Sequence, residues 1–331
     1  MKHASPIQED VVDPTSALTN LLSAPVLAFV LGLIAVAVRS DLRVPEAMTQ
    51  GLSIYLLLAI GLKGGVALRA TDAATLVIPL TLALVLGLTI PVAAFLALRV
   101  LTPLGPVDRG AIAAHYGSTS LVTFTAAVVA LETASIVVPG YAVAVLTVLE
   151  VPGIVVGLLL ARRYSALPGS WSATVREIVT GKSILLLVGG LAIGAVIGET
   201  GYAPVSPVFT DLFRGVLALF LLALGIEAGT RFSTLRRGAA GLVAFAILFP
   251  AVIGTLTVLA ATAMGLGVAG SAIFGVLCAS ASYIAAPAAV KMSLPEANLA
   301  YPLTASMTIT FPFNLLIGIP ALIWLATTLA R

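Results

Sequence analysis

The chain has 331 residues, of which 60% are hydrophobic and only 9% are charged, and its mean hydropathy is +1.15. A soluble domain carries about 25% charged residues, so this composition cannot cover a surface in water. It excludes a secreted disulfide scaffold, a nucleic-acid-binding protein and a soluble enzyme, and it predicts an all-α integral membrane protein. The net charge of +3 fits basic cytoplasmic loops better than an acidic partner. Cys278 is the one cysteine, so no intrachain disulfide can form.

Charged residues and Gly/Pro breaks divide the chain into ten hydrophobic segments, which is the number of roughly 20-residue spans that the length accommodates. Residues 1–17 lack the basic start of a signal peptide and are expected to form an external tail. No charge lies between Arg237 and Lys291, so two spans and a turn near Gly265, Gly267 and Gly270 are expected there. The predicted spans are 18–38, 47–68, 73–98, 107–131, 139–161, 183–198, 209–231, 239–264, 268–290 and 297–329.

The distribution of Lys and Arg over the loops predicts the orientation. One set of loops holds twelve basic residues and the other holds four, while Lys63 falls within a span. The positive-inside rule places the richer set in the cytoplasm and both termini outside. The richer set comprises Arg39, Arg43, Arg99, Arg109, Arg162, Arg163, Arg176, Lys182, Arg231, Arg236, Arg237 and Lys291, and the poorer set comprises Lys2, Arg69, Arg214 and Arg331.

A polar linker at 164–182 separates two halves of five spans each, 18–163 and 183–331. An odd number of spans per half forces the halves to insert with opposite orientations. Three short patterns recur in the same order, about 160–164 residues apart. Inverted repeats are typical of secondary transporters, which bind their substrate near the midplane between the repeats. The paired patterns are Ile60–Gly65 with Leu224–Gly229, Gly117–Ser120 with Ser280–Pro287, and Glu150–Pro152 with Thr310–Pro312.

The predicted fourth span contains Gly117, Ser118, Thr119 and Ser120 in succession, which is a poor helix interior. A break here would expose backbone amides at the start of a second half-helix, where the positive end of the dipole attracts an anion. The alternative interpretation is close helix packing through small residues. We expect a binding site, because an unwound backbone at membrane depth survives only where it lines a cavity.

The predicted ninth span contains Ser280, Ser282 and Tyr283 shortly before Pro287. Pro287 lacks a backbone donor and is expected to push Ala286 out of helical geometry. The freed carbonyls and the neighbouring hydroxyls suit a small cation or the edge of an oxyanion. The alternative is a simple proline kink on a packing face. Two breaks in matching spans favour one shared site.

Ionisable groups inside the predicted spans are few, and each costs a few kcal/mol unless it is paired or hydrated. Glu150 is the deepest, and either a functional role or pairing in the core is expected for it. Lys63 and Glu227 occupy matching places nearer the span ends, where snorkelling to the interface is equally consistent. His115 is a candidate proton relay or a simple donor to a backbone carbonyl.

Asn314 is either a ligand or a hydrogen bond between helices. The sequence shows no metal-ligand spacing and no phosphate loop. No acid accompanies the Ser and His residues, so an enzyme is not expected.

With these segments identified, the chain resembles the sodium-dependent bicarbonate transporter family known from cyanobacteria, over nearly its whole length beyond residue 22. No single motif is specific, but their order and spacing together are. The motifs are Ile60-Gly61-Leu62-x-Gly64-Gly65-x-Ala67-x-Arg69, Gly117-Ser118-Thr119, the acid-x-Pro of Glu150–Pro152, Leu212-Phe213-Arg214-Gly215 leading to Gly225-x-Glu227, the Ser-rich stretch ending at Pro287, and Ala305-Ser306 followed by Pro312.

The resemblance implies ten transmembrane helices in two inverted five-helix repeats, with helices four and nine discontinuous, as in bile-acid symporters. Spans 1, 2, 6 and 7 would form a gate domain and spans 3–5 and 8–10 a core domain, working by elevator-like alternating access. It also implies a homotrimer in a bacterial plasma membrane. Gly117, Ser118, Thr119, Ser280 and Ser282 match the family's segments that bind bicarbonate, and the residue pattern of the fourth span adds Ser120 to the expected substrate site. A sodium ion, the only cofactor implied, would lie near Ser280, Ser282 and Ser306.

The sequence departs from the family pattern in ways that bear on ion coupling. Tyr283 stands where the family has an aspartate, Ala279 and Ala281 replace flanking serines, and Lys63 replaces a threonine. The linker also lacks the family's long charged insert, which leaves a regulatory protein partner open. Sodium-coupled bicarbonate uptake is therefore the first hypothesis. The alternatives are proton-coupled or exchange transport of another small anion, using His115, Glu150 or Lys63, and a channel or receptor on the same scaffold.

Overall fold

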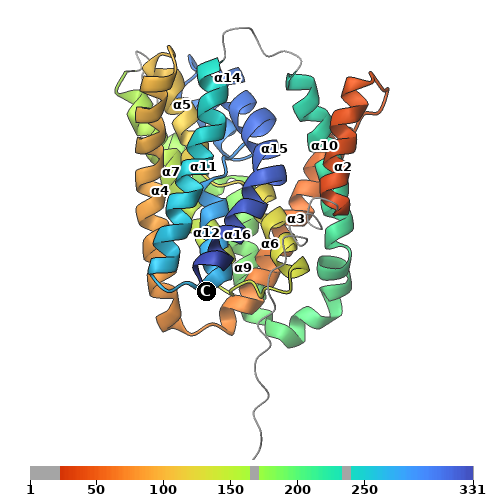
Figure 1. Cartoon of the computed structure of the whole chain (residues 1–331). Coiled ribbons are helices and arrows are strands. Elements are labelled where there is room, and N and C mark those ends of the chain that lie inside the picture. Colours follow the sequence, from red (N-terminus) through yellow and green to blue (C-terminus); the bar gives the residue numbers. More distant parts are fainter. Residues whose placement is uncertain (1–22, 165–170, 233–239, 331) are drawn as a thin grey trace, which may run out of the picture.

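The computed structural model describes residues 23–164, 171–232 and 240–330, and every regular element in these ranges is helical. The helices run side by side, and most loops gather at two opposite ends of the molecule (Figure 1). The predicted tail, 1–17, lies outside the described residues, as do Lys2, Arg236, Arg237 and Arg331. In the first half the helices are α2 (Ala24–Ala37), α3 (Glu46–Arg69), α4 (Ala73–Leu101), α5 (Pro106–Gly117), α6 (Leu121–Thr133) and α7 (Ala142–Arg162).

The second half contains the same kinds of element, and its last helical segment includes several wide, π-helical turns. The predicted linker itself contains a helix, α8 (Trp171–Thr180). It is followed by α9 (Lys182–Tyr202), η1 (Ala203–Val205), η2 (Pro207–Asp211), α10 (Phe213–Phe232), α11 (Ala240–Ala263), α12 (Gly267–Cys278), α13 (Ala286–Ser293), α14 (Ala300–Leu303), η3 (Thr304–Thr310), α15 (Phe311–Phe313), η4 (Asn314–Gly318) and α16 (Ile319–Leu329).

Eight helical segments of the described chain are long and apolar enough to cross a membrane. Each of the ten predicted spans contains helix, but two of them fall short of a full span by length. The predicted span 18–38 contains α2, with 14 residues, and the predicted span 268–290 contains α12, with 12 residues. α12 is short because the chain unwinds directly after Cys278. The eight segments are Glu46–Arg69, Ala73–Leu101, Pro106–Thr133, Ala142–Arg162, Lys182–Val205, Pro207–Arg231, Ala240–Ala263 and Ala300–Leu329.

Glycines allow four of the helices to pack in two close pairs, α2 with α10 and α3 with α9, which we call the paired-helix group. A Cβ added to Gly32 of α2 would lie 2.9 Å from the Cα of Gly225 in α10. A Cβ added to Gly61 of α3 would lie 2.9 Å from the Cα of Gly190 in α9. Small residues at such crossings let two backbones touch, which is how helices associate where lipid offers no hydrophobic driving force.

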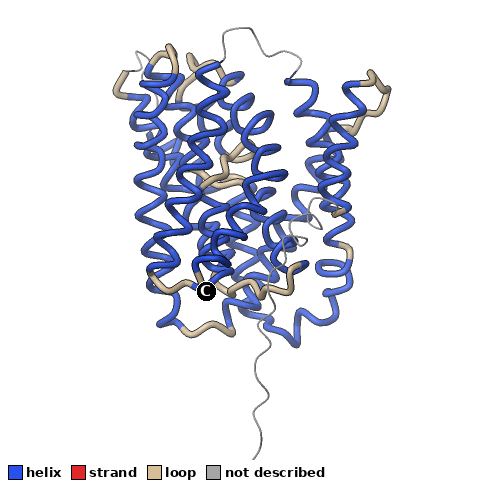
Figure 2. Tube along the Cα trace, in the orientation of Figure 1, coloured by secondary structure: helices blue, strands red, loops and turns tan. Residues whose placement is uncertain are grey.

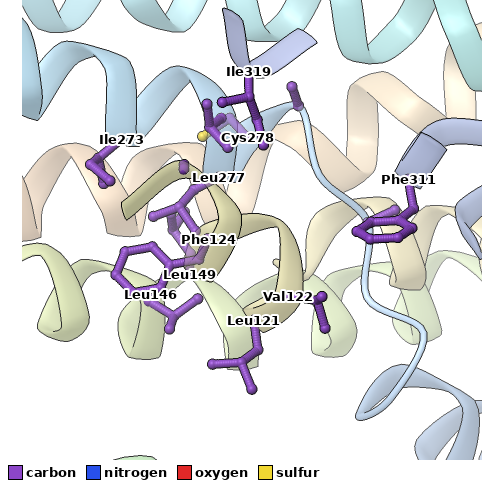
Figure 3. Close-up of a cluster of buried hydrophobic side chains, with 14 of the residues drawn as sticks. Leu121, Val122, Phe124, Leu146, Leu149, Ile273, Leu277, Cys278, Phe311 and Ile319 are labelled. Carbon is purple, nitrogen blue, oxygen red and sulfur yellow. The ribbon is translucent and has the colours of Figure 1, made fainter. Parts of the chain in front are cut away.

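The remaining long helices, α4–α7 and α11–α16, pack mainly against one another, and we call them the broken-helix group. Figure 3 shows part of its interior, where side chains of α6, α7, α12 and α16 meet, among them Phe124, Leu149, Leu277 and Ile319. The turn between α11 and α12 lies where the sequence predicts it. Gly265 and Gly267 have φ of +78° and +67°, which residues with a Cβ rarely adopt.

The glycine crossing between α3 and α9 gives a direct stability test. A Cβ at position 65 would lie 2.1 Å from the Leu191 carbonyl oxygen, so Gly65→Ala must separate the two helices. We expect a loss of about 1–3 kcal/mol, the usual cost of overpacking, seen as a lower Tm in detergent. Gly189→Ala is the matched control on α9, because a Cβ there meets nothing within 4 Å. Equal Tm values for the two variants would contradict the crossing.

Candidate functional site

The predicted break in the fourth span is confirmed. α5 ends at Gly117 and α6 begins at Leu121, while Ser118 and Ser120 between them have extended backbones, with φ, ψ of −104°, 149° and −101°, 114°. The Ser120 side chain accepts a hydrogen bond from the Thr123 amide at 3.2 Å and so caps the new helix. Figure 2 shows such loop segments inside the helical body, away from both ends of the molecule.

The ninth predicted span is also broken, but the position of the break differs from the prediction. α12 ends at Cys278 and α13 begins at Ala286, so the unwound stretch is 279–285. The expectation that Pro287 pushes Ala286 out of helical geometry is wrong, because Ala286 starts the helix. Pro287 lies in the first turn of α13, where its missing N–H would have had no helical partner.

The two breaks bind each other. The Ser120 amide donates to the Ser280 hydroxyl oxygen at 2.8 Å. The Ser282 amide donates to the carbonyl oxygens of His115 at 2.8 Å and Ser118 at 3.2 Å. All six predicted substrate residues are buried in this region: Gly117, Ser118, Thr119, Ser120, Ser280 and Ser282. Segments about 160 residues apart in sequence therefore form one structure, which we call the crossing of the two breaks.

Side chains from neighbouring helices hold the breaks in place. Asn314 of η4 donates its amide to the Ala279 carbonyl oxygen at 2.7 Å, which is one of the two roles expected for it. Thr310 donates to the Ala246 carbonyl oxygen in α11 at 2.6 Å and accepts from the Tyr116 hydroxyl, also at 2.6 Å. Sequence reasoning did not assign these roles to Tyr116 and Thr310. Thr310 was noted only because its Thr-Phe-Pro motif matches Glu150–Pro152.

The helix termini give the crossing a defined polarity. α6 and α13 both begin at a break, and α5 and α12 both end at one. N-terminal amides favour an anion, and C-terminal carbonyls favour a cation. Ser118 Oγ, Thr308 Oγ1 and Asn314 Oδ1 are buried and have no hydrogen-bond partner among the described residues. An unsatisfied buried group costs about 1–3 kcal/mol, so a bound ion or water at these atoms would be stabilising.

A cavity of about 260 Å³ reaches the second break from the side of the paired-helix group. Tyr283 and Ile284 of the break line it, together with Pro287 in the first turn of α13 and Lys182 at the start of α9. The Tyr283 hydroxyl is buried and has no hydrogen-bond partner among the described residues, and its ring packs edge-on against Phe311 with centroids 5.7 Å apart. Tyr283 therefore stands between the cavity and the crossing of the two breaks.

Glu227 lines the same cavity, so it faces the route to the break. Its carboxylate pairs with Arg231 one turn further along α10, at 3.1 Å. Both groups are partly exposed, as the snorkelling interpretation requires.

Glu150 lies beside the first break. Its side chain is buried, with 5% of the residue exposed, and it makes no hydrogen bond or ion pair with any described residue. It lies on the face of α7 between Leu146, whose carbonyl oxygen accepts from the Thr119 hydroxyl at 3.4 Å, and Gly153, which packs against the backbone of Gly117. The carboxyl is thus buried on the face of α7 that packs against the first break, and it has no partner among the described residues.

The remaining candidates have other surroundings. Lys63 lies 3.5 Å from Glu132 at the far end of α6, about 17 Å along that helix from the break at 1.5 Å per residue. His115 Nδ1 donates to the Ala111 carbonyl oxygen at 2.8 Å, as one of the two interpretations holds, while Nε2 has no partner among the described residues. Ser306 donates to the Pro302 carbonyl oxygen of its own helical segment at 2.7 Å.

Comparison with known proteins agrees with this geometry. No curated protein matches the chain. Residues 24–327 match the Na+-dependent bicarbonate transporter superfamily, which is nearly the whole of the sequence. This membership indicates a membrane transporter rather than an enzyme. The described residues contain eight helical segments long and apolar enough to span a membrane, and two broken helices whose breaks meet. In agreement with the match over residues 24–327, the chain belongs to the Na+-dependent bicarbonate transporter superfamily.

Proposed function

We propose that this protein is a sodium-coupled symporter that carries bicarbonate into the cell. The observation that carries the proposal is the crossing of the two breaks, where the Ser120 amide binds Ser280 and the Ser282 amide binds two carbonyls of α5 and the first break. This places hydroxyls, two helix N-termini and two helix C-termini around one point. Such a site accepts an anion together with a compensating cation and needs no permanent buried positive charge.

The two ions would use different atoms of the crossing. Bicarbonate would bind at Gly117, Ser118, Thr119 and Ser120 and the start of α6, since the Ser118 hydroxyl has no other partner among the described residues. Sodium would bind the Ser280 and Ser282 oxygens and nearby carbonyls, with Ser306 as a further candidate.

Glu150 would supply a negative charge near the cation. Its burial without a described partner, on the face of α7 that packs against Gly117 through Gly153, supports this role.

For the architecture, we propose ten spans in two inverted repeats, with the paired-helix group as the gate domain and the broken-helix group as the core domain. The α2–α10 and α3–α9 glycine crossings support it, because they join span 1 to span 7 and span 6 to span 2. The proposed repeat relates span 1 to span 6 and span 2 to span 7, so it relates the α2–α10 pair to the α9–α3 pair. One group would move past the other in an elevator-like manner. The protein would lie in a bacterial plasma membrane with both termini outside, and it would form a homotrimer.

Proton-coupled or exchange transport of another small anion is the second candidate. Two observations favour it: Tyr283, which is not a carboxylate, stands at the second break, and Glu150 is a buried carboxyl with no partner among the described residues. A carboxyl in such surroundings can carry a proton through the membrane.

The first test is uptake of radiolabelled bicarbonate into proteoliposomes with and without an inward sodium gradient. We expect accumulation above the external concentration only with the gradient. Uptake that ignores sodium but depends steeply on pH would select the second candidate. Equilibration without accumulation would indicate a channel, and binding without uptake would indicate a receptor.

Ser118→Ala tests the anion site with little effect on folding, because the Ser118 hydroxyl binds no described residue. A lost hydrogen bond to a charged ligand is worth about 1.5–3 kcal/mol, so we expect the KM for bicarbonate to rise about tenfold or more. Ser271→Ala is the matched control, since that hydroxyl is also buried and unpartnered among the described residues but lies within α12. Wild-type uptake by Ser118→Ala would refute the assignment of this residue.

Glu150→Gln separates the two coupling mechanisms. If Glu150 stabilises the sodium ion, the variant needs a higher sodium concentration for half-maximal uptake, while its KM for bicarbonate changes less. If Glu150 carries the coupled proton, the pH dependence of uptake disappears instead. Glu199→Gln, at an exposed position of α9, controls for the loss of one carboxylate. Unchanged sodium and pH dependence would remove Glu150 from either role.

A further inference from the structure

Three charged side chains join the two helix groups at a distance from the proposed substrate site. The Glu132 carboxylate, at the end of α6, lies 3.5 Å from Lys63 Nζ in α3 and 3.6 Å from an Arg214 guanidinium nitrogen in α10. Lys63 Nζ also lies 5.7 Å from the centre of the Phe213 ring. The carboxylate belongs to the broken-helix group, and both cations belong to the paired-helix group.

These three residues leave one positive charge in excess beside a large cavity. The cavity has a volume of about 440 Å³ and is lined by Lys63, Glu132 and Phe213, and also by Thr125 and Val128 on the same face of α6 as Glu132. The side chains of Lys63, Glu132 and Arg214 are 33%, 39% and 53% exposed, so water and dissolved ions can reach them.

The contacts between the two groups differ at the two ends of the molecule. At the Arg69 end, which is external in the proposed orientation, Glu132 bridges the groups. Toward the opposite end, the 260 Å³ cavity and a further cavity of about 200 Å³ lie between the groups, and Lys182 lines both. Cavities thus lie between the groups at both ends, and the Glu132 ion pairs bridge the groups at the external one.

We propose that Lys63 and Arg214 form an external capture site for a small oxyanion, and that Glu132 occupies this site while the transporter is closed to the outside. The proposal rests on the proposed function, which supplies the anion and the relative movement of the two groups. A carboxylate and bicarbonate each spread one negative charge over two oxygens of one carbon, so the same ammonium and guanidinium can bind either. When α6 withdraws, an anion from outside replaces Glu132, and the returning carboxylate later expels it.

The strength of the pairing suits this exchange. Exposed ion pairs are weak and easily broken, whereas a buried pair would resist separation. The position of the carboxylate also matters, because Glu132 lies on the half-helix whose other end is Ser120 of the crossing. The helix that carries the Glu132 carboxylate thus begins at the proposed binding site.

The test measures access to the cavity from outside, and it does not depend on bicarbonate transport. Thr125→Cys places a thiol on the cavity wall, and Cys278, the one native cysteine, is buried. We expect a membrane-impermeant thiosulfonate reagent to label Thr125→Cys slowly. Adding Glu132→Gln should raise the labelling rate about threefold or more, because it removes the stabilisation that a weak, exposed ion pair gives to the closed state. Glu199→Gln, the same substitution outside this ion-pair cluster, should leave the rate unchanged.

The anion site itself is tested by protection from labelling. In the Glu132→Gln background, external bicarbonate should slow labelling relative to the same concentration of gluconate. Arg214→Gln should also speed labelling, because it weakens the bridge, but it should abolish the protection and raise the KM for bicarbonate. Arg214 is the most exposed of the three side chains, so this variant serves if Glu132→Gln does not fold.

Two results would overturn the proposal: equal labelling rates for Glu132→Gln and Glu199→Gln, or protection that persists without Arg214. Failure of the proposed function gives a different pattern. In that case bicarbonate uptake is absent, while Glu132→Gln still speeds labelling and other small anions still protect through Lys63 and Arg214.

Discussion

The hydrogen bonding between two unwound segments is the constraint on which the rest of this structure depends. Backbone amides and carbonyls inside a membrane have no water to bind, so a break in one helix needs a partner of its own. Here each break supplies the partner for the other, through Ser120 and Ser280 on one side and Ser282 with two carbonyls on the other. The same bonds turn four helix ends toward one point, and the polarity of the site follows from that.

The two helix groups are held together by different contacts. In the paired-helix group, backbone contact at Gly32 and Gly225, and at Gly61 and Gly190, leaves little room for the helices to shift. In the broken-helix group, Asn314 and the Tyr116–Thr310–Ala246 chain tie both breaks to surrounding helices. Backbone contact therefore holds one group together, and buried hydrogen bonds hold the breaks of the other in place.

Much of this architecture could be predicted from the sequence, because hydropathy and glycine patterns are local. The turn at Gly265 and Gly267 and the break at Ser118–Ser120 follow from residues within one or two turns of the feature, and so do most of the helix ends. The break before Pro287 was placed too late, because proline suits a first helical turn as well as a kink. The Glu132 pairings and the Tyr116–Thr310 bond could not be predicted, since they join residues 69 to 194 positions apart.

The wide turns of the last helical segment determine which of its side chains reach the crossing. η3 and η4 place an extra residue in a turn, on either side of the short α15, in the stretch that contains Thr310 and Asn314. Such turns rotate everything downstream relative to a regular helix, by about 100° for each added residue. The extra residues in these turns therefore set the direction in which Asn314 points. Loss of a single residue from η3 would turn Asn314 away from the Ala279 carbonyl, although Asn314 itself would still be present.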